Sequence, residues 1–241
     1  MGERIFGNGA GLAHRLIHRI GHHLGHSRHR GESGAGHKTE AGQQTGAGDE
    51  SWNGDRYDRV SARLLRPLYR KVSSEVAAAA PSGATVLDVG AGTGRLLLSL
   101  TRRRPDLKLL GVDISPEMVR VATRNAQYSD VIIEQGDIRR LPHADNSVDF
   151  VISTLSMHHW ESVRPAVAEL ARVLRPGGEL WIYDFRFVSA QRLKDAVREE
   201  ARFADRAVER VPVRIWRLPI TPIVRFSLTA SRPATLGNLV E

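Results

Sequence analysis

The chain has 241 residues, 41% of them hydrophobic, which is enough to build one sizeable core. It contains no cysteine, which excludes disulfide frameworks, zinc ribbons and thiol nucleophiles. The net charge of +8 comes from scattered arginines and indicates non-specific association at most, so we do not expect a nucleic-acid partner. No apolar run approaches the roughly 20 residues that cross a bilayer, and no secretory signal is evident, which predicts a cytoplasmic protein.

The first 50 residues differ from the rest in composition. They hold 12 of the 22 glycines and 7 of the 10 histidines, and we expect a disordered tail at residues 1–50 before a domain at residues 51–241. Within residues 10–30, aliphatic residues and histidines each recur every four positions, on opposite faces of a would-be helix. Such a helix could contact a membrane surface or bind metal, but its glycines favour the tail interpretation.

Helical periodicity opens the domain. Apolar residues recur at helical spacing from about Tyr57 to Ala80, and Pro81 with Gly83 ends this predicted helix. The positions that define its apolar stripe are Val60, Leu64, Leu68 and Val72.

Aliphatic strands then alternate with amphipathic helices. The predicted strands are "TVLDV" (85–89), "LKLLGVD" (107–113), "VIIEQGD" (131–137), "VDFVIST" (148–154) and "ELWIYDF" (179–185). The helices between them are expected at residues 94–103, 115–126 and 162–174, the second with Ser115 as N-cap and Pro116 at its first position. Strands and helices that alternate at this spacing indicate a parallel sheet covered on both faces.

The C-terminal part carries weaker signals. A helix is predicted over residues 190–210, with its stripe at Leu193, Val197, Ala201, Ala204 and Val208. Beyond it, apolar pairs stand around prolines at 212, 219 and 222, a pattern that suits an edge hairpin better than a central strand. The chain as a whole predicts an α/β fold, a Rossmann-like, seven-stranded, mostly parallel sheet with helices on both faces.

A glycine-rich turn follows the first predicted strand. Gly90, Gly92 and Gly94 read G-x-G-x-G after Asp88, at the end of the sheet where ligands of such folds bind. A tight turn without a ligand would give the same short motif. Asp113, however, ends the second strand 23 residues after Gly90, where a carboxylate can accept both hydroxyls of a ribose.

Four motifs together resemble one family. "VLDVGAGTGRL", "GVDISPEMV", "QGDIRRLPHADNSVDFVIS" and "ELARVLRPGGELWIYDF", in this order and spacing, resemble class I S-adenosylmethionine-dependent methyltransferases of the ubiquinone/menaquinone C-methyltransferase-like subgroup. The resemblance covers about residues 58–185. It implies S-adenosylmethionine as cofactor and in-line transfer of a methyl group to a small-molecule acceptor.

The resemblance also implies roles for the matching residues. Those implied to bind the cofactor follow the ends of four strands: Asp88, Gly90, Gly92 and Gly94 at its methionine part, Asp113 at the ribose, Asp137 at the adenine amino group, Ile114 and Ile138 at the base, and Ser153 and Leu155 near the transferred methyl. Glycines let the main chain approach such a ligand where a Cβ would collide.

His158 and His159, on the loop after the fourth strand, are the candidate catalytic residues. A histidine has a pKa near neutral and could take a proton from a hydroxyl or acidic carbon of the acceptor. Alternatively, both histidines shape the pocket or cap the next helix. We expect Trp160 to be a packed wall, His143 to lie in a surface loop without a role, and no metal to be bound.

Two other functions stay open at this point. Asp113 would serve a nicotinamide-dependent oxidoreductase equally well, although G-x-G-x-G in place of G-x-G-x-x-G argues against NAD(P). The domain could also bind its cofactor without catalysis, as a scaffold. We expect residues 57–80 and 186–222 to cover the pocket, which suits a small molecule better than a protein or tRNA, and the sequence does not fix the oligomeric state.

Overall fold

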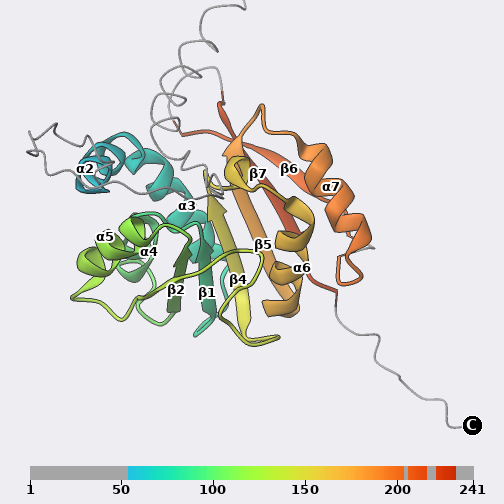
Figure 1. Ribbon diagram of the computed structural model, residues 1–241, viewed down its shortest axis with the longest axis horizontal. Helices are drawn as coiled ribbons and strands as arrows, with labels where there is room; N and C mark the ends of the chain where they lie inside the picture. The colour runs from blue at the N-terminus through green and yellow to red at the C-terminus, as the bar shows by residue number, and fades with distance from the viewer. Residues whose placement is uncertain (1–53, 204–205, 216–220, 232–241) are drawn as a thin grey trace, which may run out of the picture. The chain divides into compact units, whose positions relative to one another are not determined.

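The protein is described here by a computed structural model, which covers residues 54–203, 206–215 and 221–231 (Figure 1). The predicted tail at residues 1–50 and the possible membrane contact of residues 10–30 lie outside the described residues. No helix within the described ranges is long and apolar enough to cross a bilayer.

Two helices precede the sheet where one is predicted. α2 (Gly54–Leu64) and α3 (Arg66–Ala79) are separated at Leu65, and Pro67 lies in the first turn of α3. Proline lacks the N–H that a helix interior needs and disfavours helical geometry in the residue before it, so it is tolerated in a first turn. Pro67 therefore divides the predicted helix.

The break also changes which apolar residues are buried. Leu68 and Val72 on α3 are buried as predicted, whereas Val60 and Leu64 on α2 are 43% and 48% exposed. The predicted stripe is wrong for these two residues, because α2 buries Gly54, Asp58 and Ser61 instead.

Seven strands of the described chain form one sheet. They are β1 (Thr85–Val89), β2 (Lys108–Asp113), β3 (Ile132–Gln135), β4 (Val148–Thr154), β5 (Leu174–Phe185), β6 (Glu209–Val213) and β7 (Ile223–Thr229). Their order is β3-β2-β1-β4-β5-β7-β6. β1 to β5 pair in parallel, and β7 pairs antiparallel with both β5 and β6, which confirms the predicted mostly parallel sheet.

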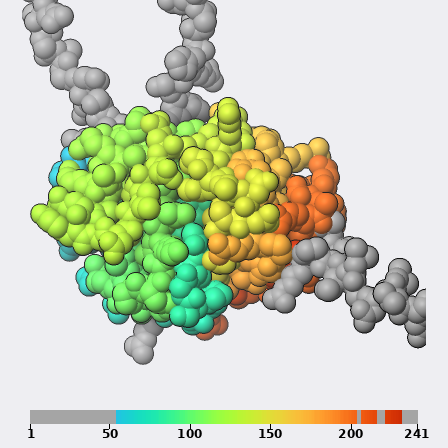
Figure 2. Space-filling view, turned by 90° about the horizontal axis from the view of Figure 1, so that it is seen from below, coloured from blue at the N-terminus to red at the C-terminus, as the bar shows by residue number. Residues whose placement is uncertain are grey.

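The strand order reverses between β1 and β4. From β1 the chain moves outward through α4 (Arg95–Thr101) and α5 (Pro116–Ala126), and from β4 it moves the other way through α6 (Val163–Val173). Because such crossovers are right-handed, the two sets of helices cover opposite faces of the sheet. Figure 2 shows the two halves of the chain, green and yellow to orange, side by side on one surface. Ligands bind at such a switch point, beyond the carboxyl ends of the strands.

The helix that follows β5 is shorter than predicted. α7 (Ala190–Glu199) ends one turn before Phe203, which is fully buried although it lies off the predicted stripe. Burying this ring takes the place of continuing the helix, so the prediction of a helix to residue 210 is wrong. β6 begins at Glu209 instead and forms the predicted edge hairpin with β7, carrying Pro212 at the edge of the sheet.

Local signals place α5 as expected. The Oγ atom of Ser115 accepts a hydrogen bond from the N–H of Met118 at 3.3 Å, and Pro116 is the first helical residue. This cap fixes the turn that follows β2, and with it the direction of Asp113.

Candidate functional site

The glycine turn joins β1 to α4 and contains three residues with positive φ. Gly90, Gly92 and Gly94 have φ values of 71°, 54° and 74°, which residues with a side chain rarely adopt. A Cβ on Gly90 would lie 2.2 Å from the Oγ atom of Ser156, so the loop after β4 packs against this turn. A Cβ on Gly92 would meet nothing within 4 Å. The turn is thus closed on one side and open on the other.

Two carboxylates flank the open side of this turn. Asp88 is 2% exposed, and its Oδ1 atom has no partner among the described residues. Asp113 accepts hydrogen bonds from the N–H of Gly92 at 2.8 Å and from the N–H of Ser115 at 2.9 Å. Burial, and then the charge of Asp113, raise the pKa of Asp88 well above its usual range. A ligand with a positive charge would stabilise the ionised form of Asp88, and hydroxyl groups on it could donate hydrogen bonds to Asp113.

The residues expected around the adenine lie at the next strand ends. The N–H of Gly136 donates to the carbonyl of Asp113 at 3.0 Å, which brings the end of β3 to the end of β2. Asp137 is paired with the guanidinium of Arg139 at 2.6 Å, and this pair lowers the pKa of Asp137. Ile114 is 64% exposed, whereas Ile138 packs against the hydrophobic core. The structure therefore gathers Asp113 and Asp137 but leaves the two isoleucines in different surroundings.

The end of β4 approaches the glycine turn from the other half of the sheet. Ser153 is fully buried and its Oγ atom has no partner in the described chain. Leu155 has a φ of 55°, a strained value for a leucine, and donates its N–H to the carbonyl of Tyr183 at 2.8 Å. This turn directs the chain to Ser156, whose Oγ atom accepts a hydrogen bond from the indole of Trp160 at 3.0 Å.

His158 is held by a buried carboxylate that the sequence analysis does not identify. The ring Nδ1 atom of His158 lies 2.9 Å from Oδ1 of Asp184. The backbone N–H of His158 donates to Oδ2 of Asp184 at 3.0 Å. Asp184 is fully buried and also accepts the N–H of Phe185 at 2.8 Å. An acidic residue inside the apolar strand "ELWIYDF" is the signal that could have revealed it, since a buried carboxylate needs a partner.

The other two histidines lie in different surroundings. The ring of His159 packs against that of His158 with centroids 4.0 Å apart, and burial, followed by the charge of His158, lowers the pKa of His159. His158 and His159 both belong to the short 3₁₀ helix η1 (Met157–His159). His143 lies in the loop between β3 and β4, as expected, with its side chain 9% exposed and its Nδ1 atom 3.8 Å from Oε2 of Glu134. Trp160 belongs to the core, as packing predicts.

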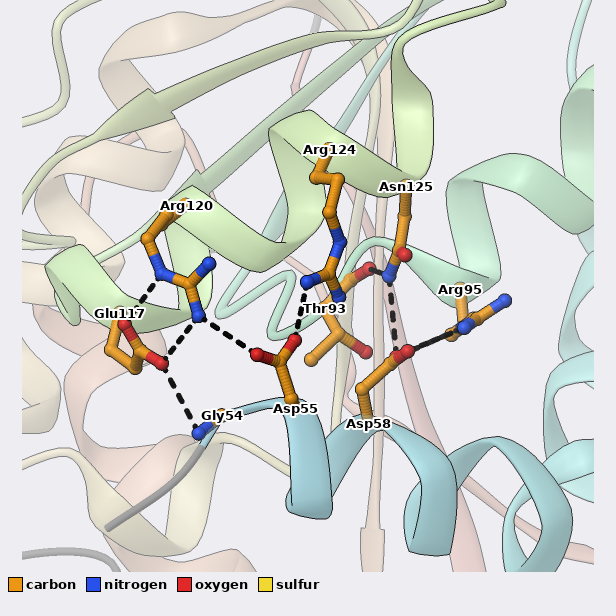
Figure 3. Close-up of polar contacts among 9 residues, drawn as sticks. All are labelled: Gly54, Asp55, Asp58, Thr93, Arg95, Glu117, Arg120, Arg124 and Asn125. Carbon is orange, nitrogen blue, oxygen red and sulfur yellow. Dashed lines mark hydrogen bonds and ion pairs between the residues drawn. The ribbon is translucent and has the colours of Figure 1, made fainter. Parts of the chain in front are cut away.

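α2 is attached to α5 by polar contacts (Figure 3). Asp55 forms ion pairs with Arg124 at 2.5 Å and with Arg120 at 3.3 Å. Glu117 accepts the N–H of Gly54 at 3.2 Å and pairs with Arg120 at 2.8 Å. The acids at the start of α2 and the arginines four apart on α5 form a charge pattern that the sequence analysis does not use.

A second contact joins α2 to the glycine turn. Asp58 accepts hydrogen bonds from Nε of Arg95 at 2.9 Å and from the side-chain amide of Asn125 at 3.2 Å. Asn125 also donates to the carbonyl of Thr93, within the turn, at 3.0 Å (Figure 3). The buried residues of α2 are Gly54, Asp58 and Ser61, so polar contacts and not apolar packing hold this helix.

Tyr57 lies on the same side of α2. Burial raises its pKa, and the charges of Asp113 and Asp58 raise it further, which places the phenol beside the carboxylates of the site. The helix predicted over residues 57–80 thus corresponds to α2 and α3, and Tyr57 belongs to α2.

Comparison with known proteins agrees with this geometry. Residues 87–182 match a family described as methyltransferase domain. The demethylmenaquinone methyltransferase of Deinococcus radiodurans is 35% identical over 118 residues, which are 48% of this chain and 48% of that protein. The malonyl-[acyl-carrier protein] O-methyltransferase of Methylococcus capsulatus is 34% identical over 154 residues, 64% of this chain and 53% of that protein. The chain thus spans about half the length of these curated relatives.

A solved structure shows the same fold. It is a SAM-dependent methyltransferase from Aquifex aeolicus, which is 19% identical, has a TM-score of 0.56 and covers 74% of this chain and 99% of its own. Residues 87–182 therefore form a methyltransferase domain, and the sheet and glycine turn around them are those of the class I S-adenosylmethionine-dependent type.

Proposed function

We propose that this chain transfers the methyl group of S-adenosylmethionine to a small-molecule acceptor by in-line displacement. The observation that carries the proposal is the unpartnered, buried Oδ1 atom of Asp88 beside a glycine turn that is open at Gly92. A cationic amino-acid tail fits there, because a buried carboxylate is costly without a partner.

The remaining cofactor contacts follow from the strand ends. Asp113 still has acceptor capacity beside its two backbone hydrogen bonds and would hold the ribose hydroxyls. Asp137 would accept the adenine amino group, with Ile114 and Ile138 at the base. Ser153 and Leu155 would lie near the reacting methyl.

When bound, S-adenosylmethionine supplies a methyl group on a positively charged sulfur, which leaves as a neutral thioether. The protein's task is to align the acceptor with this methyl and to exclude water, which can contribute roughly 7 to 11 kcal/mol to the barrier reduction. α2 and the loop after β4 enclose the glycine turn and serve this purpose.

His158 supports proton removal from the acceptor. Asp184 accepts the Nδ1 proton of His158, which leaves the lone pair of Nε2 available as a base. The proton moves from the acceptor to Nε2 as the acceptor atom bonds to the methyl carbon, and the carboxylate of Asp184 stabilises the imidazolium that forms. His159 has a lowered pKa and shapes the pocket.

The surroundings of His158 favour an acceptor with a flat apolar part. The ring of Phe185 lies 5.3 Å from that of His158, and Phe187 stacks on Phe185 at 5.1 Å with an interplanar angle of 3°. Phe187 is 60% exposed. An aromatic or conjugated acceptor with a hydroxyl or an acidic carbon would stack on this pair and present its proton to His158.

Two measurements test the proposal. Calorimetry of the full chain should show binding of one S-adenosylmethionine, no binding of NADH, and a large loss of affinity in Asp88→Asn. Incubation with cofactor carrying a labelled methyl and fractionated cell extract should then transfer the label to a small molecule. Binding of NADH in place of S-adenosylmethionine, or label found only in protein or RNA, would overturn the proposal.

A further inference from the structure

A basic hollow lies between α3 and α4, which pack side by side (Figure 1). Its volume is about 470 Å³, and its lining includes five arginines: Arg66, Arg70, Arg95, Arg102 and Arg103. None of the residues assigned to the cofactor lines it. The hollow is therefore a second candidate site, with a lining that shares no residue with the set assigned to the cofactor.

Most of its positive charge is uncompensated. Arg95 is paired with Asp58, but the guanidinium groups of the other four form no hydrogen bond or ion pair with any described residue. No acidic residue is among those that line the hollow. Four like charges around one hollow repel one another, and an anion bound between them would replace this repulsion by attraction.

The type of side chain narrows the chemistry of this anion. Arginine presents a planar fork of donors that binds phosphate oxygens in pairs. Arg66 and Arg70 lie one turn apart on α3, facing Arg102 and Arg103 near the end of α4. Tyr69 and Ser99 also belong to the lining, and the Ser99 hydroxyl is hydrogen-bonded to that of Ser73 at 2.8 Å. A single carboxylate would engage one fork, whereas linked phosphates would engage several.

We propose that this hollow binds a ligand that carries two or more linked phosphate groups. A nucleic-acid strand is the less suitable occupant, because the arginines are gathered in one hollow with a single aromatic residue, Tyr69, and base stacking needs a series of such rings. The diphosphate can belong to a free metabolite or to a lipid headgroup, and the shared chemistry is the polyphosphate.

The experiment titrates the full chain with sodium diphosphate and with monophosphate at about 0.15 M salt, where long-range attraction is screened. Diphosphate should bind at one site, at least 10-fold more tightly than monophosphate. Two double variants, Arg66→Gln with Arg70→Gln and Arg102→Gln with Arg103→Gln, should each weaken binding at least 10-fold while keeping the melting temperature. The control Arg59→Gln with Arg63→Gln removes the same charge from the exposed face of α2 and should change affinity less than 2-fold.

Vesicles separate the two sources. A lipid ligand is assigned if the chain binds vesicles with phosphorylated headgroups, if both double variants lose this binding, and if free diphosphate displaces the vesicles. A soluble ligand is assigned if the chain binds diphosphate but not the vesicles. Failure to bind diphosphate at millimolar concentration, an equal loss in the control variant, or tighter binding of a single-stranded oligonucleotide than of diphosphate would overturn the proposal. None of these outcomes depends on methyl transfer.

Discussion

The Nδ1 atom of His158 lies 2.9 Å from Oδ1 of Asp184, a carboxylate that has no exposed surface and that comes from the neighbouring strand β5. The same carboxylate binds the backbone N–H of His158, so the residue is held at two points. His159, next along the chain, has no such partner in the described structure. This difference supports the preference for His158 over His159 as the candidate base, which the sequence already indicates because His158 lies nearer the end of the fourth strand.

Replacing His158 by Gln should lower turnover by about 10²- to 10⁴-fold without changing cofactor affinity, because only the transition state uses the proton transfer. Replacing His159 by Gln should change turnover by a few-fold at most, and mainly raise KM for the acceptor. Steady-state kinetics with an identified acceptor and calorimetry with S-adenosylmethionine measure the two effects. Near-normal turnover of the His158 variant would end the general-base role.

We propose that Asp184 is a positioning residue for His158, and Asp184→Asn tests this role. The amide keeps only one of the two acceptor oxygens and carries no charge to stabilise an imidazolium, so turnover should fall about 10- to 10³-fold with an unchanged KM for the acceptor. If Asp184 were only structural, the melting temperature would fall and turnover of the remaining folded protein would be normal.

Asp88→Asn should make the cofactor-free protein more stable at pH 7. The folded-state pKa of Asp88 lies above the unfolded value, so its contribution to stability is full below about pH 4 and is lost as the pH rises through the folded-state pKa. Asparagine cannot ionise and so avoids this loss. We expect the free energy of unfolding to rise by roughly 1 to 3 kcal/mol, the scale of an unsatisfied buried polar group.

Denaturant unfolding at several pH values measures this effect. The advantage of the variant should shrink as the pH falls and vanish below about pH 4, where the wild-type carboxyl becomes protonated in both states. Added S-adenosylmethionine should stabilise the wild type and not the variant. A variant that is less stable than the wild type at pH 7 would show that Asp88 has a partner in the free protein.

Asp113→Asn should weaken cofactor binding by roughly 2 to 3 kcal/mol, the scale of hydrogen bonds to a charged group. Asparagine is preferred to alanine, because the side chain also accepts the N–H of Gly92 and alanine would release the glycine turn. Asp130→Asn, at an exposed position, is the matched control. Equal affinities of the two variants by calorimetry would reject the ribose role.

Asp58→Asn should loosen α2. Burial alone would raise the pKa of Asp58, but the hydrogen bonds it accepts, led by that of Arg95, lower it, so the ionised form stabilises the folded protein above about pH 4. Amide hydrogen exchange should therefore quicken in residues 54–64 of the variant, and in the wild type as the pH falls below 4 after correction for intrinsic rates.

The control for this prediction is Asp195→Asn on α7, which removes an exposed ion pair with Arg198. Exchange in α2 should be unaffected there. If the exchange of residues 54–64 stays the same in Asp58→Asn, Tyr57 and the backbone hold the helix without this ion pair.

The five parallel strands and the start of α5 could be predicted because their signals are local. "TVLDV" and "VDFVIST" are short aliphatic runs between turns, and Ser115 followed by Pro116 is a local signal for the start of a helix. The glycine turn lies at the ligand-binding edge of the sheet because it follows β1, one of the two strands between which the strand order reverses.

The parts that could not be predicted depend on distant partners. Phe203 ends a helical pattern because the core has room for its ring, and Val60 is exposed because Asp58 rather than an apolar residue faces the domain. Asp184 pairs with a histidine 26 residues away, and spacing in the sequence does not report such a contact. Only the sheet register, which sets β5 beside β4, brings the two together.

The positions of Phe185 and Phe187 relative to His158 have an evolutionary consequence. Asp184 and Phe185 belong to strand β5, whose register is fixed on both sides by β4 and β7, whereas Phe187 lies just past the end of that strand. Substitutions at and after Phe187 can therefore reshape the surface that we propose to meet the acceptor, while the imidazole of His158 keeps its place. A single domain of this kind can diverge towards new acceptors one residue at a time, without first losing its chemistry.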